Sequence, residues 1–135
     1  MAGRLARALA YGSAGYCVDF SFTAVNSWRR TGRAKRSSLW NVPVYALAQP
    51  LFEPVHEALR RRAIAPARAL VYGLGIVGVE YASGRALRRV LGAAPWDYSH
   101  ARRHVDGLVR PDFVPLWGAL GLGLEALHDL LVGRR

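Results

Sequence analysis

Four blocks of apolar residues alternate with short basic segments along the chain. The blocks cover about residues 8–28, 39–58, 65–84 and 112–132, each close to the ~20 residues that a helix needs to cross a bilayer. We find no sustained strand alternation and recognise no internal repeat. The pattern predicts an all-α fold: a four-helix transmembrane bundle, one integral membrane domain over residues 1–135, with both termini on one side.

Two features modify this picture. The second block holds Pro43, Pro50 and Pro54, each of which removes a backbone donor, and membrane helices tolerate the resulting kinks when neighbours satisfy the freed carbonyls. Between the third and fourth blocks, arginines alternate with apolar residues over positions 85–91. This spacing predicts an amphipathic connection lying in the membrane interface.

The chain is strongly basic, with 19 Lys and Arg against 9 Asp and Glu and a net charge of +10. Most of the cations lie between the apolar blocks, an arrangement that suits anionic lipid headgroups or nucleic acid. No nucleic-acid-binding motif accompanies them, so we expect a lipid bilayer, with anionic lipids, as the partner and no nucleic acid. Gly73, Gly75 and Gly78 spell GxGxxG inside an uninterrupted apolar run, without the strand and turn of a dinucleotide site, and no cofactor is predicted.

Each block carries one deeply placed acid, namely Asp19, Glu53, Glu80 and Glu125. An acid facing lipid at the centre of a helix costs about 2.5 to 3.5 kcal/mol, so we expect all four to face inward. Packed together they cannot all ionise, and they need protons, bound cations, histidines or inward-reaching arginines such as Arg68. Two interpretations stay open: an ion-binding or proton-binding site, or pairing with arginine that fixes the packing of the bundle.

The second and fourth blocks share the pattern Glu-x-x-His, with Glu53 and His56 in one and Glu125 and His128 in the other. Together with one acid from each remaining helix, this is the ligand pattern of carboxylate-bridged di-iron bundles. The rise of a helix, however, places Glu53 and Glu80 roughly 13 Å apart along the bundle, too far for one dinuclear site. We therefore predict no metal site and keep a membrane di-metal oxidoreductase as a lesser alternative. No catalytic residue is predicted, and the chain is not expected to be an enzyme.

The string Trp96-Asp97-Tyr98-Ser99 follows the third block, and Asp112 and Trp117 open the fourth. Tryptophan and tyrosine of this kind commonly lie at headgroup depth, with the ring buried and the polar tip in water. Asp97 is placed to bind an arginine or to cap the segment that follows it. We predict that these residues form an interfacial or structural motif.

Several of these residues carry a family resemblance. They are Gly15 and Tyr16 before Asp19, then Glu53, the run from Tyr72 to Tyr81 with Gly84, the string Pro95 to Ser99, Gly107 and Leu108, Asp112, Trp117 and Glu125. In this pattern the chain resembles the transmembrane protein 229 family, also described as "Putative ABC-transporter type IV". The resemblance implies a multi-pass membrane protein, and it carries no substrate or catalytic residue with it.

The leading functional hypothesis is therefore a permease-like or ion-coupled or proton-coupled transport component whose four inward acids bind a proton or a cation. Because four short helices enclose little volume, we expect a homo-oligomer or a larger transporter complex. The alternative is a structural or accessory membrane protein that binds anionic lipid.

Overall fold

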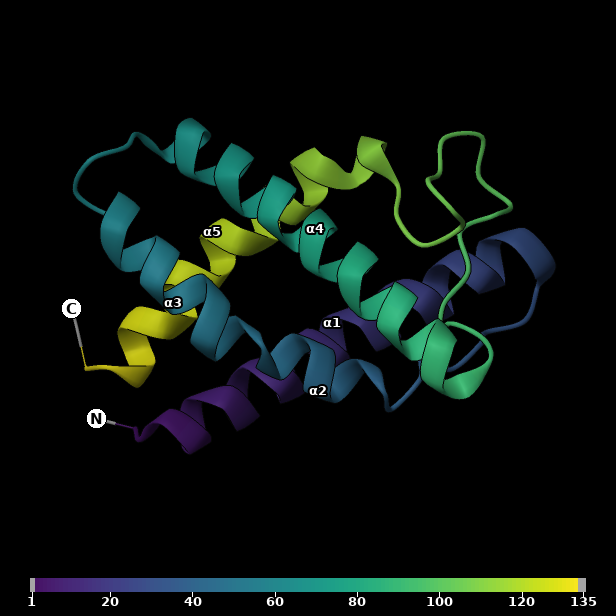
Figure 1. Ribbon diagram of the computed structural model, residues 1–135, viewed down its shortest axis with the longest axis horizontal. Helices are drawn as coiled ribbons and strands as arrows, with labels where there is room; N and C mark the ends of the chain where they lie inside the picture. Colours follow the sequence, from purple (N-terminus) through teal and green to yellow (C-terminus); the bar gives the residue numbers. More distant parts are fainter. Residues whose placement is uncertain (1, 134–135) are drawn as a thin grey trace.

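The structure, a computed structural model, describes residues 2–133, which form helices joined by loops (Figure 1). The prediction of an all-helical fold is confirmed for these residues. A long helix is followed by a kinked or shorter one in each half of the chain. The elements in order are α1 (Arg4–Thr31), α2 (Asn41–Ala46), α3 (Ala48–Leu59), α4 (Ala65–Leu91), the 3-10 helix η1 (Pro111–Phe113) and α5 (Val114–Leu131).

Local sequence explains where these helices begin and end. The long helices α1 and α4 end at Gly32 and Gly92, whose φ angles of 70° and 80° are the left-handed conformation in which glycine closes a helix without strain. The prolines of the second apolar block divide it into α2 and α3, which meet at Leu47, as the sequence predicts. The predicted amphipathic connection is wrong in its first part, because residues 85–91 continue α4 instead of lying apart from it.

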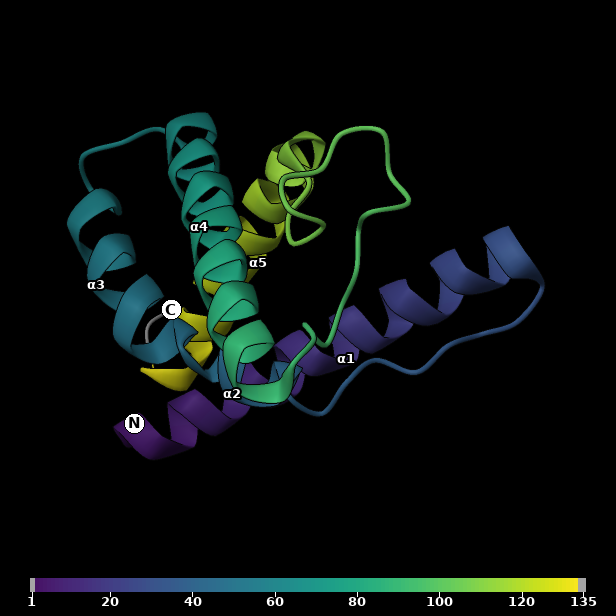
Figure 2. The ribbon, with the colours of Figure 1, turned by 45° about the vertical axis from the view of Figure 1, so that its right-hand side comes forward.

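The two long helices begin at the same end of the molecule, and α3 and α5 return towards that end (Figure 1). The two ends of the described chain also lie there, joined by a hydrogen bond from the Ala2 amide to the Leu131 carbonyl at 3.0 Å. Figure 2 shows the second half of α1 extending beyond the other helices, with the segment 32–40 running back beside it. The two ends of the described chain are therefore neighbours, whereas their placement on one side of a membrane stays a prediction.

Polar and charged side chains occupy much of the interior. The buried polar residues among those described are Ser27, Asn41, Glu53, His56 and His128, as many as the buried apolar ones. Large apolar side chains lie outside instead, including Leu5 at 75% and Val90 at 79% exposure. The unusual feature is the share of polar groups in the interior, because buried residues in water are mostly apolar.

Over residues 2–133, no helix has both the length and the apolar character required to cross a membrane. The four predicted segments are therefore helical, but none of them qualifies as a membrane-spanning helix. Charged residues within the helices explain the difference, since Arg7 and Asp19 lie in α1 while Arg68, Glu80 and Arg85 lie in α4. The prediction counted apolar positions and treated the acids and Arg68 as inward-facing, and it left Arg7 just outside the first span.

Candidate functional site

A first cluster of buried polar groups joins α1 to α3. The guanidinium of Arg7 holds Glu53 with two hydrogen bonds, of 2.7 Å and 3.0 Å, and donates a third to the carbonyl of Ala2. Gln49 and the hydroxyl of Tyr11 also donate to Glu53, at 2.9 Å and 3.2 Å. Such paired, charge-assisted bonds hold the carboxylate in one orientation.

A second cluster between α4 and α5 repeats the first. Arg68 holds Glu125 with two hydrogen bonds, of 2.7 Å and 3.1 Å, and donates to the carbonyl of Ala63. The hydroxyl of Tyr72 donates to Glu125 at 2.7 Å. The predicted partnership of Arg68 with an inward acid is confirmed, and Arg7, which the sequence analysis did not select, plays the equivalent part.

Two histidines connect the clusters. His128 on α5 lies 2.9 Å from the hydroxyl of Tyr11 on α1, and His56 on α3 lies 3.1 Å from the hydroxyl of Tyr72 on α4. The centres of the two imidazole rings are 5.0 Å apart. Each histidine therefore contacts the tyrosine of the other cluster, so that the two clusters form one buried network.

The two clusters correspond to an internal repeat in the sequence. Residues 7–12 read RALAYG and residues 68–73 read RALVYG, differing only at the fourth position. Further along, VPVYA at 42–46 matches VPLWG at 114–118, and EPVHE at 53–57 matches EALHD at 125–129. The expectation that the chain holds no repeat is wrong. We call residues 4–59 repeat 1 and residues 65–131 repeat 2.

The contacts between the repeats are reciprocal. Repeat 1 gives a histidine to the tyrosine of repeat 2, and repeat 2 gives a histidine to the tyrosine of repeat 1. Backbone packing follows the same rule within each repeat: a Cβ on Gly12 would meet the Val42 carbonyl oxygen at 3.0 Å, and one on Gly73 would meet that of Val114 at 2.4 Å. Reciprocal contacts of this kind define an approximate two-fold axis, and it passes between the two imidazoles.

The other two predicted acids, Asp19 and Glu80, occupy equivalent positions in the repeats and lie apart from the arginine clusters. Asp19 accepts hydrogen bonds from Ser37 and, at 2.8 Å, from Asn41. Glu80 accepts one from the Tyr98 hydroxyl at 2.9 Å, and its second oxygen is buried with no hydrogen-bond partner among the described residues. The structure thus separates the four acids into two pairs with different surroundings.

A cavity of about 210 Å³ lies between the repeats. Its polar lining includes both Asp19 and Glu80, together with Tyr45, Tyr98 and Trp117, and most of its remaining wall is aliphatic. The two acids therefore share a mostly apolar chamber to which both repeats contribute.

Glu53 and Glu80 differ in the pKa of their carboxyl groups. Burial alone would raise the pKa of Glu53, but hydrogen bonds from Arg7 and Gln49 outweigh it and lower the pKa to about 2. At Glu80 burial prevails and raises the pKa to about 7, helped by the negative charge of Asp19 and opposed by Tyr98 and Trp117. With no guanidinium at Glu80 to offset desolvation, this carboxyl can take up and release a proton near neutral pH.

The motif predicted to be interfacial folds into the loop that covers Glu80. The indole of Trp96 donates to the Leu108 carbonyl at 2.9 Å, and Asp97 accepts from both the amide and the hydroxyl of Ser99. Tyr98 lies between them and reaches Glu80. The other predicted motif residues separate: Asp112 is exposed and paired with Arg110, and Trp117 is buried against the cavity.

The positions of the four acids and two histidines can be compared with the ligand set of a di-iron centre. The structure brings His56 and His128 together, but Glu53 and Glu125 are held in two-point contacts by arginines, and neither Asp19 nor Glu80 joins them. Six carboxylate and imidazole ligands around one dinuclear centre are therefore not assembled. The residues that the sequence analysis missed, Arg7, Tyr11 and Tyr72, had a visible signal in the repeated RAL-x-YG string.

Fold and site together define an all-helical, internally duplicated protein with buried polar clusters and many exposed apolar side chains. The chain belongs to the family described as "Putative ABC-transporter type IV", whose model matches residues 9–134. The family name indicates a transporter-related protein, and the finer resemblance to the transmembrane protein 229 family is not shown. No solved structure matches the chain.

Proposed function

We propose that this chain is a permease-like component of a transport system and that Asp19 and Glu80 are its proton-binding or cation-binding pair. One observation carries the proposal: these equivalent acids, one from each repeat, line the same cavity, and within residues 2–133 no arginine or lysine pairs with either. Glu53 and Glu125, by contrast, are neutralised by arginine, so we assign them no ion.

The duplicated architecture supports this proposal. Many secondary transporters consist of two related repeats, and their substrates and coupling ions bind at the interface between the repeats. The cavity of this chain has that position, and one oxygen of Glu80 is buried there beside Trp117 without a well-formed hydrogen bond among residues 2–133. A group that binds and releases a proton near neutral pH also suits coupling to a proton gradient.

The exterior supports an apolar environment for the same component. Large aliphatic and aromatic side chains cover α1 and α4, among them Leu9, Val25, Trp28, Leu70 and Leu74, all more than half exposed. Apolar side chains exposed in such number favour contact with lipid or with another protein. We propose contact with a lipid bilayer rich in anionic headgroups, in a homo-oligomer or a larger transporter complex.

A structural or accessory role is the second candidate, and the arginine clusters favour it. The Arg7 and Arg68 pairs hold α1 against α3 and α4 against α5 without leaving a carboxylate free for a ligand. For Glu53 and Glu125 this structural interpretation suffices. The two candidates therefore differ only in what Asp19 and Glu80 do.

Proton flux into vesicles tests the proposal. The purified chain would be reconstituted into phosphatidylcholine vesicles containing phosphatidylglycerol and a pH-sensitive dye, and a pH gradient would be imposed. We expect flux that Glu80→Gln and Asp19→Asn reduce at least tenfold and that Asp112→Asn, an exposed carboxylate outside the cavity, leaves unchanged. Equal flux in all four proteins would refute the proposed role of the pair.

A further inference from the structure

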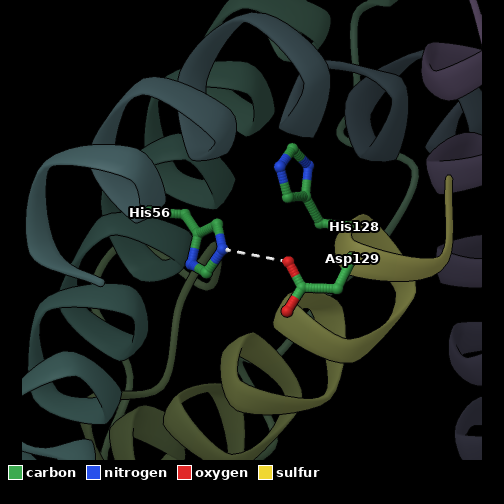
Figure 3. Close-up of side chains that lie close together, drawn as sticks. All are labelled: His56, His128 and Asp129. Atoms are coloured by element: carbon green, nitrogen blue, oxygen red, sulfur yellow. Dashed lines mark ion pairs between the residues drawn. The ribbon is translucent and has the colours of Figure 1, made fainter. Parts of the chain in front are cut away.

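The place where the internal two-fold axis passes between the repeats holds two buried imidazoles. His56 comes from α3 and His128 from α5, with only 1% and 3% of their surfaces exposed. Figure 3 shows Asp129 on the same side of His56 as His128, in the space between α3 and α5. The proposed transport role does not use this cluster.

The surrounding hydrogen bonds determine which ring nitrogen carries a proton. The hydroxyl of Tyr72 has one proton and donates it to Glu125, at 2.7 Å, because a carboxylate is a stronger acceptor than a neutral imidazole. His56 must then donate from Nδ1 to the oxygen of the same hydroxyl, 3.1 Å away. The equivalent chain runs from His128 through Tyr11 to Glu53.

With Nδ1 protonated, Nε2 of each neutral ring carries a lone pair. Nε2 of His56 is buried, has no hydrogen-bond partner among the described residues and faces Oδ1 of Asp129 at 3.9 Å. Nε2 of His128 faces Oε1 of Glu57 at 3.1 Å. The lone pair on Nε2 of His56 is therefore buried without a donor among the described residues, which is the position a metal ion would fill.

We propose that His56, His128 and Asp129 bind a single divalent transition-metal ion of the zinc class, with Glu57 beside it. One ligand atom from each of the three lies within 4.8 Å of the others. Because the ligands of a tetrahedral zinc ion lie about 3.4 Å apart, binding draws them inward by no more than about 1.4 Å. Imidazole nitrogens with a carboxylate oxygen select zinc-class ions over Mg²⁺ or Ca²⁺.

The outer groups match those around known metal ligands. A metal-binding histidine commonly donates its second ring nitrogen to a fixed acceptor, which sets the tautomer. Here Tyr72 and Tyr11 are those acceptors, and Glu125 and Glu53 fix them in turn. Arg60 pairs with Oδ1 of Asp129, the oxygen that faces His56, so the ion would share this carboxylate with the guanidinium.

Metal titration of the full, untagged chain tests this site. After chelator treatment and dialysis, Zn²⁺ binding would be measured by calorimetry and elemental analysis, and Co²⁺ would report ligand geometry through its visible absorption. We expect one ion per chain, intense tetrahedral Co²⁺ bands and a higher melting temperature with zinc. Failure to bind Zn²⁺, as expected if a proton occupies the site instead, overturns the proposal.

Variants locate the ion. Asp129→Asn and His128→Gln should each weaken Zn²⁺ binding at least tenfold and remove the Co²⁺ bands. The partly exposed Asp129 lies at the edge of the cluster, so its variant should keep the helical circular-dichroism spectrum even if the buried histidine variant unfolds. The matched control replaces His100 and His104, the two exposed histidines of the basic loop, with Gln and should bind normally. The assignment is overturned if the control variant loses Zn²⁺ binding and Asp129→Asn keeps it.

Discussion

Replacing Glu80 with Gln keeps the shape of the side chain but removes its proton equilibrium. In the folded protein burial raises the pKa of this carboxyl from 4.5 to about 7, so the folded state binds the proton more tightly than the unfolded chain. The stability that Glu80 contributes is therefore fully present below pH 4.5 and is lost as the pH rises through about 7. One pKa unit corresponds to about 1.4 kcal/mol, so the full loss is about 3 kcal/mol.

Most of that loss falls between pH 5 and pH 8, where urea unfolding followed by tryptophan fluorescence gives the free energy of unfolding. Over this range Glu80→Gln should gain about 2.5 kcal/mol in stability relative to wild type. Asp112→Asn is the control, because this exposed acid pairs with Arg110 and its pKa is lowered, so it stays ionised over this range.

Three titratable groups face Glu80, namely Asp19 from α1, Tyr45 from α2 and Tyr98 from the covering loop. Burial raises the pKa of both tyrosines far above the range of the experiment, so they stay neutral. The charge of Asp19 contributes to the raised pKa of Glu80, and Asp19→Asn should move the stability transition to lower pH. Parallel profiles for wild type and Glu80→Gln would refute the reasoning.

Two further predictions concern the repeats and use the same unfolding measurement. Tyr11→Phe and Tyr72→Phe each remove a hydroxyl that joins a buried carboxylate to a histidine, so each should cost about 1 to 3 kcal/mol, with costs of similar size. A loss confined to one of them would contradict the equivalence of the repeats. Gly73→Ala should lower the free energy of unfolding, because the new Cβ would lie 2.4 Å from the Val114 carbonyl oxygen. Gly75→Ala has open space around it and should stabilise α4 by up to about 1 kcal/mol, which makes it the matched control.

The sequence predicted the helices well because apolar blocks and basic breaks persist over whole elements. It also predicted that acids in these blocks need inward partners, and Arg68 with Glu125 meets that expectation. Arg7 was passed over because it stands at the start of an apolar block, where an arginine usually flanks a helix. Its real role depends on Glu53, which lies far away in the sequence.

The repeat and the cavity were harder to infer. The two halves differ at informative positions, such as Asp19 against Glu80 and Tyr45 against Trp117, and the connecting loops differ in length. The cavity depends on the break at Leu47 and on where the loop places Tyr98, and neither is a property of local sequence. The sequence also could not predict which large apolar side chains would be exposed, because helical spacing does not say which face of a helix packs against a neighbour.

The exchange of histidines between the two halves has a consequence for how this molecule is built. Each half lacks a group that only the other supplies, so the chain resembles a symmetric dimer whose subunits have been tethered through residues 60–64. Once fused, the copies no longer had to stay identical. In both copies the glutamate held by arginine is the same residue, whereas the acid at the cavity is aspartate in one copy and glutamate in the other.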